Sequence, residues 1–201
     1  MRLRLVLIVV AAFAIGAILA LVLRGDLGRL VNGFGQSGGR ALVGGPFTLT
    51  DHTGKRVSET DFAGRYMLVY FGFTYCPDAC PAGLQLIGET MERLGAKARQ
   101  VVPIFITVDP ERDTVEQMSA YVANFHPQLV GLTGTLEEIT DAARAYRVYF
   151  AKVEDDSSGD GYSVDHTSII YLMGRTGAYV THFRHGMTSE EMAKRILQHV
   201  S

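Results

Sequence analysis

The sequence predicts an α/β domain with a mixed central sheet, preceded by one membrane-spanning helix. Three observations lead to this fold class. Apolar segments typical of buried strands alternate with segments of helical periodicity. The last two strand-like segments flank the turn 174–177, which predicts an antiparallel hairpin. Cys76 and Cys80 follow the first strand that is apolar throughout, and a cysteine pair at that place makes the predicted fold thioredoxin-like.

Residues 1–24 contain the predicted anchor. Every residue from Leu5 to Leu23 is apolar or glycine, and a run of roughly 20 such residues can cross a bilayer as a helix. Arg2 and Arg4 precede the run and favour a cytoplasmic N-terminus. A cleaved signal peptide is the alternative, but its apolar core is normally shorter and a cleavage site of small residues should follow it. Since no Arg- and Ser-rich transit sequence precedes the run, we expect an uncleaved, single-pass anchor in a bacterial inner membrane, with the globular part in the periplasm.

Residues 25–43 are rich in glycine, as is typical of a flexible linker, and residues 44–201 make up one predicted globular domain. The formal charge of −2 and the lack of a basic cluster in the sequence give no indication of nucleic-acid binding. In an oxidising compartment an unprotected pair of neighbouring thiols tends to form a disulfide. A metal or a reductant would therefore be needed to keep Cys76 and Cys80 reduced.

Turn and capping signals give the order of elements in the globular part. A hairpin around the turn 51–54 and a second turn at 61–64 precede the first buried strand. Three threonines, Thr114, Thr135 and Thr188, each stand three residues before a Gln or Glu, which is the capping-box pattern that begins a helix. Strands are expected in the hairpin 47–57 and at 66–71, 101–108, 129–132, 148–153, 167–173 and 178–183. Helices are expected at 85–98, 114–125, 135–146 and 188–200, and a polar loop is expected at 154–165.

The segment Phe71–Pro81 carries the chemistry. It lies where a strand turns into a helix, and its last proline suits a first helical turn. The N-terminus of a helix has free N–H groups and a positive dipole end, so it favours a thiolate over a thiol. In a helix the Cys-x-x-x-Cys spacing places both sulfurs on one face, where they can bind one ion or form one disulfide. A purely structural disulfide is the weaker alternative, because closing so short a loop adds little stability.

One of the six histidines stands out as a third ligand. His166 lies at the entrance of the strand 167–173, which by topology neighbours the cysteine strand, and Asp165 is a candidate partner for its ring. Thioredoxin-type reductases have a proline at this entrance, and this sequence has none. The remaining histidines are better explained as solvated, capping or adventitiously metal-binding residues: His52, His126, His182, His185 and His199. Two thiolates and one imidazole suit copper(I), or copper(II) if an oxygen ligand is added, whereas zinc normally takes four ligands.

Four motifs, Phe71–Pro81, Thr107–Thr114, Leu132–Thr135 and Val164–Ser168, closely resemble the Sco/SenC family in sequence and order. The resemblance runs from about Gly44 to the C-terminus. It implies a thioredoxin-fold, copper-binding protein of a bacterial or mitochondrial inner membrane that serves the assembly of cytochrome c oxidase.

The resemblance also implies roles for individual residues. Cys76, Cys80 and His166 match the family's copper ligands, and Asp78 and Asp165 match acidic positions near the site. One small departure is an alanine at position 79, where valine is common in the family. The segment 109–114 matches a family signature, and capping chemistry alone explains it as a turn that begins the next helix.

Two functions follow as hypotheses. The first is a metallochaperone that delivers copper to the binuclear copper centre of the oxidase, with the copper-bearing oxidase subunit as partner. The second is a membrane-anchored thiol-disulfide oxidoreductase that reduces the cysteines of that centre. Other periplasmic copper chaperones or thiol reductases are further expected partners. A copper or redox sensor ranks last, and a peroxiredoxin is excluded because Phe73 stands where that pattern requires threonine.

Overall fold

The computed structural model describes residues 43–155, 161–184 and 186–200. The predicted anchor at residues 1–24 and almost all of the predicted linker at 25–43 lie outside these ranges. So do the tip of the polar loop, at 156–160, and His185. Within the described ranges, no helix has both the length and the apolar character needed to cross a membrane.

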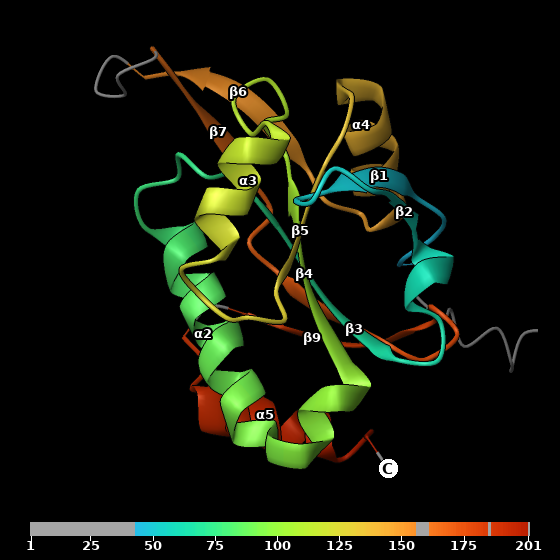
Figure 1. The fold of residues 1–201 in the computed structure, drawn as a ribbon. Coiled ribbons are helices and arrows are strands. Elements are labelled where there is room, and N and C mark those ends of the chain that lie inside the picture. The colour runs from blue at the N-terminus through green and yellow to red at the C-terminus, as the bar shows by residue number, and fades with distance from the viewer. Residues whose placement is uncertain (1–42, 156–160, 185, 201) are drawn as a thin grey trace, which may run out of the picture. The chain divides into compact units, whose positions relative to one another are not determined.

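A seven-stranded sheet forms the centre of the domain, in the order β2-β1-β5-β4-β3-β8-β9 (Figure 1). Strand β3 pairs parallel with β4 and antiparallel with β8, so the predicted mixed sheet is confirmed. The strands of this sheet are β1 (Thr48–Asp51), β2 (Arg56–Ser58), β3 (Tyr66–Gly72), β4 (Val101–Thr107), β5 (Val130–Thr133), β8 (Ile170–Met173) and β9 (Tyr179–Phe183). Strands β4 and β8 are buried along their whole length, as their largely apolar sequences indicate.

Helices cover both faces of this sheet (Figure 1). The helices are α2 (Ala79–Leu94), α3 (Val115–Val122), α4 (Leu136–Ala145) and α5 (Ser189–Leu197), with the short 3₁₀ helices η1 (Glu59–Phe62) and η2 (Gly95–Gln100). Helix α2 connects β3 to β4, and α3 connects β4 to β5, both in the same direction across the sheet. Right-handed crossovers therefore place α2 and α3 on one face. Helix α5 packs against α2 on that face, and α4 contacts β1 on the other face.

The capping boxes that begin α4 and α5 are present as predicted, at Thr135 and Thr188. At α3 the prediction is half right. The Thr114 hydroxyl accepts a hydrogen bond from the backbone N–H of Gln117, but the Gln117 side chain does not return to the cap. It donates instead to the hydroxyl of Thr74, at 3.0 Å. The Gln117 side chain therefore bonds to the cysteine loop rather than accepting from the backbone N–H of Thr114.

The polar loop expected at 154–165 is shorter than predicted, because it contains a strand. Strand β7 (Tyr162–His166) pairs antiparallel with β6 (Phe150–Glu154) in a separate two-stranded sheet. Figure 1 shows this hairpin beside the helical layer, outside the seven-stranded sheet. The residues of β7 alternate between apolar or aromatic and polar types, which is a strand signal, but it is only five residues long and follows a Gly- and Ser-rich segment.

Candidate metal and thiol site

Sheet topology brings the two predicted halves of the site together. Strand β3 ends where the antiparallel strand β8 begins, with Tyr70 paired to Ile170. The cysteine loop after β3 and the segment before β8 therefore leave the sheet at the same end. Cys76, Cys80 and His166 converge there, and their sulfur and ring nitrogen atoms all lie within 4.8 Å of one another. The sequence prediction that these three residues meet is confirmed.

Cys80 lies in the first turn of α2 and is completely buried. Its Sγ atom lies 3.3 Å from Nε2 of His166. The sulfur fits because Gly72, the last residue of β3, has no side chain. A Cβ atom at that position would lie 2.7 Å from the Cys80 sulfur and 2.8 Å from the ring of Phe105. The absence of a side chain at Gly72 therefore leaves the space that the Cys80 sulfur occupies.

Cys76 lies in the loop before α2 and is half-buried. Its Sγ accepts a hydrogen bond from the backbone N–H of Cys80, at 3.3 Å, as expected for a thiolate at a helix N-terminus. A hydrogen bond from the Cys80 thiol, with a smaller contribution from His166, lowers the pKa of Cys76 to about 4 although burial opposes it. The same interaction with Cys76, together with burial, raises the pKa of Cys80. Both cysteines are free, and these opposite pKa shifts make Cys76 the thiolate and Cys80 the thiol of the pair at neutral pH.

The imidazole of His166 is held from two sides. Its Nδ1 atom lies 3.3 Å from the carbonyl oxygen of Thr167, and its ring packs edge-on against Phe73 and Tyr70, with centroid distances of 5.9 and 6.4 Å. This arrangement turns Nε2 toward the cysteines. Asp165, the expected partner of the ring, is exposed, because neighbouring residues of a strand point to opposite faces. The carbonyl of Thr167 takes that place instead.

The other described histidines are not part of this cluster. His52 is more than a solvated turn residue, since its Nδ1 accepts the backbone N–H of Gly131 at 3.2 Å and so links the first hairpin to β5. His126 accepts the N–H of Gln128 in the turn after α3. His182 pairs with the hydroxyl of Tyr179 at 2.6 Å. His199 is exposed.

Sequence reasoning missed the role of the segment between β4 and α3. It predicted only a capping turn at 109–114, whereas Asp113 is fully buried beneath the cysteine loop. The Asp113 carboxylate accepts hydrogen bonds from the backbone N–H of Thr74, at 3.0 Å, and from the hydroxyls of Thr74 and Thr107, at 2.6 and 2.5 Å. Burial raises the pKa of Asp113, and these three donors counteract that rise. No local pattern signals this contact, because Thr74 lies 39 residues away in the chain.

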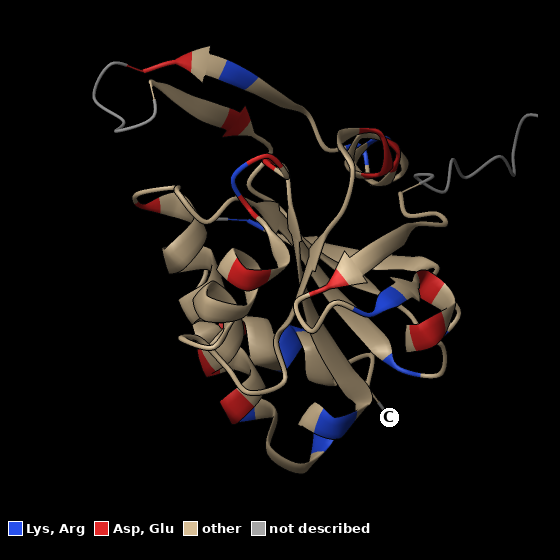
Figure 2. Cartoon of the chain, turned by 45° about the horizontal axis from the view of Figure 1, so that its top comes forward, with Lys and Arg blue, Asp and Glu red and all other residues tan. Residues whose placement is uncertain are grey.

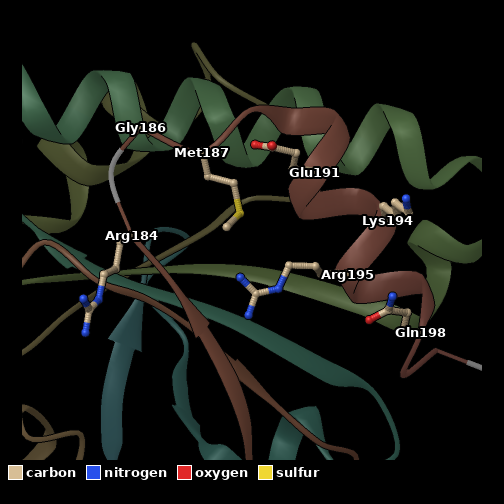
Figure 3. A pocket seen from close by; sticks show the side chains of 7 residues that line it. All are labelled: Arg184, Gly186, Met187, Glu191, Lys194, Arg195 and Gln198. Atoms are coloured by element: carbon tan, nitrogen blue, oxygen red, sulfur yellow. The ribbon is translucent and has the colours of Figure 1, made fainter.

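A groove of about 530 Å³ lies between β9 and α5 (Figure 3). It is lined by Arg184, Gly186, Met187, Glu191, Lys194, Arg195 and Gln198. Three of these side chains are basic, and none belongs to the cysteine–histidine cluster. The groove has no soft ligand apart from the thioether of Met187, so the thiol chemistry is confined to the end of the sheet described above.

Comparison with known proteins agrees with this geometry. The sequence profile of the family described as SCO1/SenC matches residues 35–201. The chain belongs to the SCO1/SenC family. The family resemblance stated from the four motifs is confirmed.

Individual members of the SCO1/SenC family show how close the match is. The human protein named "Protein SCO1 homolog, mitochondrial" is 44% identical over 164 residues, which are 81% of this chain and 54% of the relative. The chain thus spans about half the length of that relative. The structure of Bradyrhizobium japonicum ScoI with copper bound is 45% identical, with a TM-score of 0.72, and covers 78% of this chain and 98% of that one.

A more distant SCO1/SenC structure is that of BsSco. It is described as containing a disulfide switch and as a member of the Sco family of cytochrome c oxidase assembly proteins. It is 25% identical to this chain, with a TM-score of 0.63, over 81% of this chain and 96% of that one. These likenesses confirm the thioredoxin-like α/β fold with its mixed central sheet.

Proposed function

We propose that this protein binds one copper ion through Cys76, Cys80 and His166 and delivers it to the binuclear copper site of a cytochrome c oxidase subunit. The observation that carries the proposal is the convergence of two sulfurs and one imidazole nitrogen within 4.8 Å. A copper-bound structure of a family member with 45% identity supports the choice of metal. The description of BsSco as one of the cytochrome c oxidase assembly proteins supports the choice of process.

The donor set fits copper(I) better than it fits other common metals. Thiolates are soft ligands that select copper(I), and zinc would require a fourth ligand to close its coordination shell. The carbonyl of Thr167 at Nδ1 of His166 fits a ligating histidine, since such a histidine normally donates its second ring N–H to an oxygen. Two thiolates would also more than neutralise the single charge of copper(I) and leave the complex slightly anionic.

Three ligands suit a cargo that must leave again. A three-coordinate copper(I) ion has room for an incoming thiolate of the oxidase subunit, so ligands can be exchanged one at a time. His166 belongs to the small β6–β7 sheet, whereas both cysteines are attached to the main sheet and α2. We expect the imidazole to be the first ligand replaced and the cysteines to be the last.

The same proposal places the domain at a membrane. The predicted span at Leu5–Leu23 and the linker at 25–43 would tether residues 44–201 to the outer face of a bacterial inner membrane, with the N-terminus in the cytoplasm. A periplasmic domain on such a tether can reach an oxidase subunit in the same membrane. Both the span and its orientation follow from the sequence pattern alone.

Copper(I) binding by the full-length chain, purified in detergent and measured in competition with a chelator, tests the site. We expect the wild type to bind one copper(I) ion tightly. C76A and C80A should each abolish tight binding. H166A should loosen the binding by at least about tenfold, because loss of a ligand should cost no less than the roughly tenfold to hundredfold that loss of a ligand's hydrogen-bond partner costs. H126A is the matched control and should bind as the wild type does. Unchanged affinity in all three site variants would contradict the assignment.

A second function is supported by the two thiols themselves. The Cys76 thiolate can attack a disulfide of the partner, forming a mixed disulfide and releasing one partner thiolate. Cys80 then loses its proton and attacks Cys76, so the partner gains two electrons and this protein ends as a Cys76–Cys80 disulfide. The low pKa of Cys76 and the buried thiol of Cys80 behind it favour these two roles.

The two functions differ in their need for copper. A disulfide-bonded, copper-free fragment of the oxidase subunit should be reduced by the copper-free protein if it is a reductase. C80S should then trap the mixed disulfide. If the copper-free protein leaves that disulfide intact, and a reduced fragment takes copper(I) from the copper-loaded protein, the protein is a delivery chaperone.

A further inference from the structure

The β6–β7 hairpin, which carries His166 at its end, makes few apolar contacts with the rest of the domain. Only Val164 of its ten strand residues is fully buried, and Lys152, Glu154 and Asp165 are exposed. Figure 2 shows charged residues along both strands of the hairpin. Apolar burial alone therefore contributes little to holding this hairpin against the rest of the domain.

Tyr162, at the opposite end of β7 from His166, supplies a polar contact. Its hydroxyl donates to the carboxylate of Asp109, with distances of 3.0 and 3.3 Å to the two oxygens. Asp109 is buried in the turn after β4. The hairpin is thus attached to the same segment that supports the cysteine loop through Asp113.

Arg112 lies at the centre of this attachment. Its guanidinium carbon lies 3.8 Å from the ring centroid of Tyr162 and 4.7 Å from that of Tyr75, the residue before Cys76. A third ring, Phe73, is 5.8 Å away. The guanidinium also donates to the Asp109 carboxylate at 2.5 Å and to the backbone carbonyl of Tyr162 at 3.3 Å. Its side chain is only 11% exposed, so these contacts are largely screened from water.

We propose that Arg112 is a positioning residue that clamps the β6–β7 hairpin to the cysteine loop and thereby sets the place of His166 relative to Cys76 and Cys80. One planar cation stacks on Tyr75 from the cysteine side and on Tyr162 from the histidine side. Asp109 fixes the plane of that cation and holds the Tyr162 hydroxyl. The consequence for copper rests on the proposed function, whereas the clamp itself is a property of the copper-free protein.

The chemistry of the clamp favours arginine specifically. A guanidinium is planar and can stack on two rings while it donates in its own plane to a carboxylate and a carbonyl. A lysine keeps the charge but presents a compact, more strongly hydrated ammonium that cannot make these contacts together. R112K should therefore show most of the defect of R112M, which a purely electrostatic role would not produce.

Amide hydrogen exchange of the full-length, copper-free protein tests the clamp. In R112M we expect the amides of 150–154 and 162–166 to exchange about tenfold faster while those of β3 and β4 stay unchanged, because only the hairpin is released. Y162F, which keeps the ring and removes the bond to Asp109, should show a smaller change at the same amides. R144M is the control, since Arg144 forms an exposed ion pair with Asp141 away from the hairpin. Unchanged exchange in the hairpin, or an equal rise throughout the domain, would overturn the proposal.

A double-mutant cycle links the clamp to the metal. R112M should weaken copper(I) binding by about tenfold in the wild-type background and leave it unchanged in the H166A background, because the clamp acts through the imidazole. Equal losses in both backgrounds would contradict the positioning role. If the wild type itself fails to bind copper(I), the proposed function fails, and the exchange experiment still decides whether the clamp exists.

Discussion

The two halves of the site are built in contrasting ways. The cysteine half extends from a strand in the middle of the main sheet, is closed by the buried carboxylate of Asp113 and leads directly into a sixteen-residue helix. The histidine half ends a five-residue strand of a separate two-stranded sheet, held to the domain largely through side chains. Elements with few buried contacts open at lower free energy than a core sheet does. We therefore expect the hairpin that carries His166 to open at lower free energy than the cysteine half, with the Arg112 clamp limiting that opening.

The largest expected effect is a loss of stability when Asp113, which supports the cysteine half, is replaced. D113A leaves the Thr74 backbone N–H and two threonine hydroxyls without their buried acceptor. We expect the free energy of unfolding to fall by about 4 kcal/mol, because each buried unsatisfied polar group costs about 1–3 kcal/mol. Chemical denaturation measures it. D141A, which removes an exposed carboxylate, should change the stability by less than about 0.5 kcal/mol. A similar loss of stability in both variants would show that the buried hydrogen bonds of Asp113 stabilise the fold no more than an exposed carboxylate does.

The same substitution made once in each half compares them directly. V69A removes two methyl groups from the middle of β3, and V164A removes the same groups from β7, where both valines are buried. We expect losses of about 3 kcal/mol for V69A and about 1 kcal/mol for V164A, since a loosely held hairpin collapses around a cavity better than a core sheet does. Urea denaturation with circular dichroism gives both values. Equal losses of stability in the two variants would contradict the proposed difference between the two halves.

The smallest expected effect is the pH dependence of copper(I) affinity, which the protonation of Cys76 and Cys80 sets. Cys76, with a pKa of about 4, is already a thiolate at neutral pH, whereas the pKa of Cys80 is raised. Copper(I) must therefore displace one proton, that of Cys80, and not two. Deprotonation favours binding, so the affinity should rise about tenfold per unit between pH 7 and pH 8. Chelator competition at several pH values measures the slope, and a hundredfold rise per unit would show that both thiols start protonated.

Residues that act through local chemistry could be predicted from the sequence. The Cys-x-x-x-Cys spacing, the strand-to-helix transition and the capping boxes at Thr135 and Thr188 all depend on neighbours within a few positions. His166 could be placed because topology puts β8, the strand that follows it, beside β3. These signals were sufficient to bring the three candidate ligands together.

Residues that act across long stretches of chain could not be predicted. Asp113 meets Thr74 and Arg112 meets Tyr162, over separations of 39 and 50 residues, and the capping chemistry of their own segment gave a complete local explanation. Gln117 was assigned to a cap for the same reason, although its side chain reaches the cysteine loop. Strand β7 was missed because its alternation is short and follows a segment that favours loops.

The turn between β8 and β9 lies at the far end of β8 from His166. Residues 174–177 close it with hydrogen bonds between Gly174 and Ala178 and between Gly177 and Gly174, and Thr176 is exposed. A dye or a surface linkage attached at Thr176 would therefore be separated from both ligand loops by the length of a strand. Such a label would leave the thiol end of the domain open, so that its encounter with another protein could be followed by fluorescence.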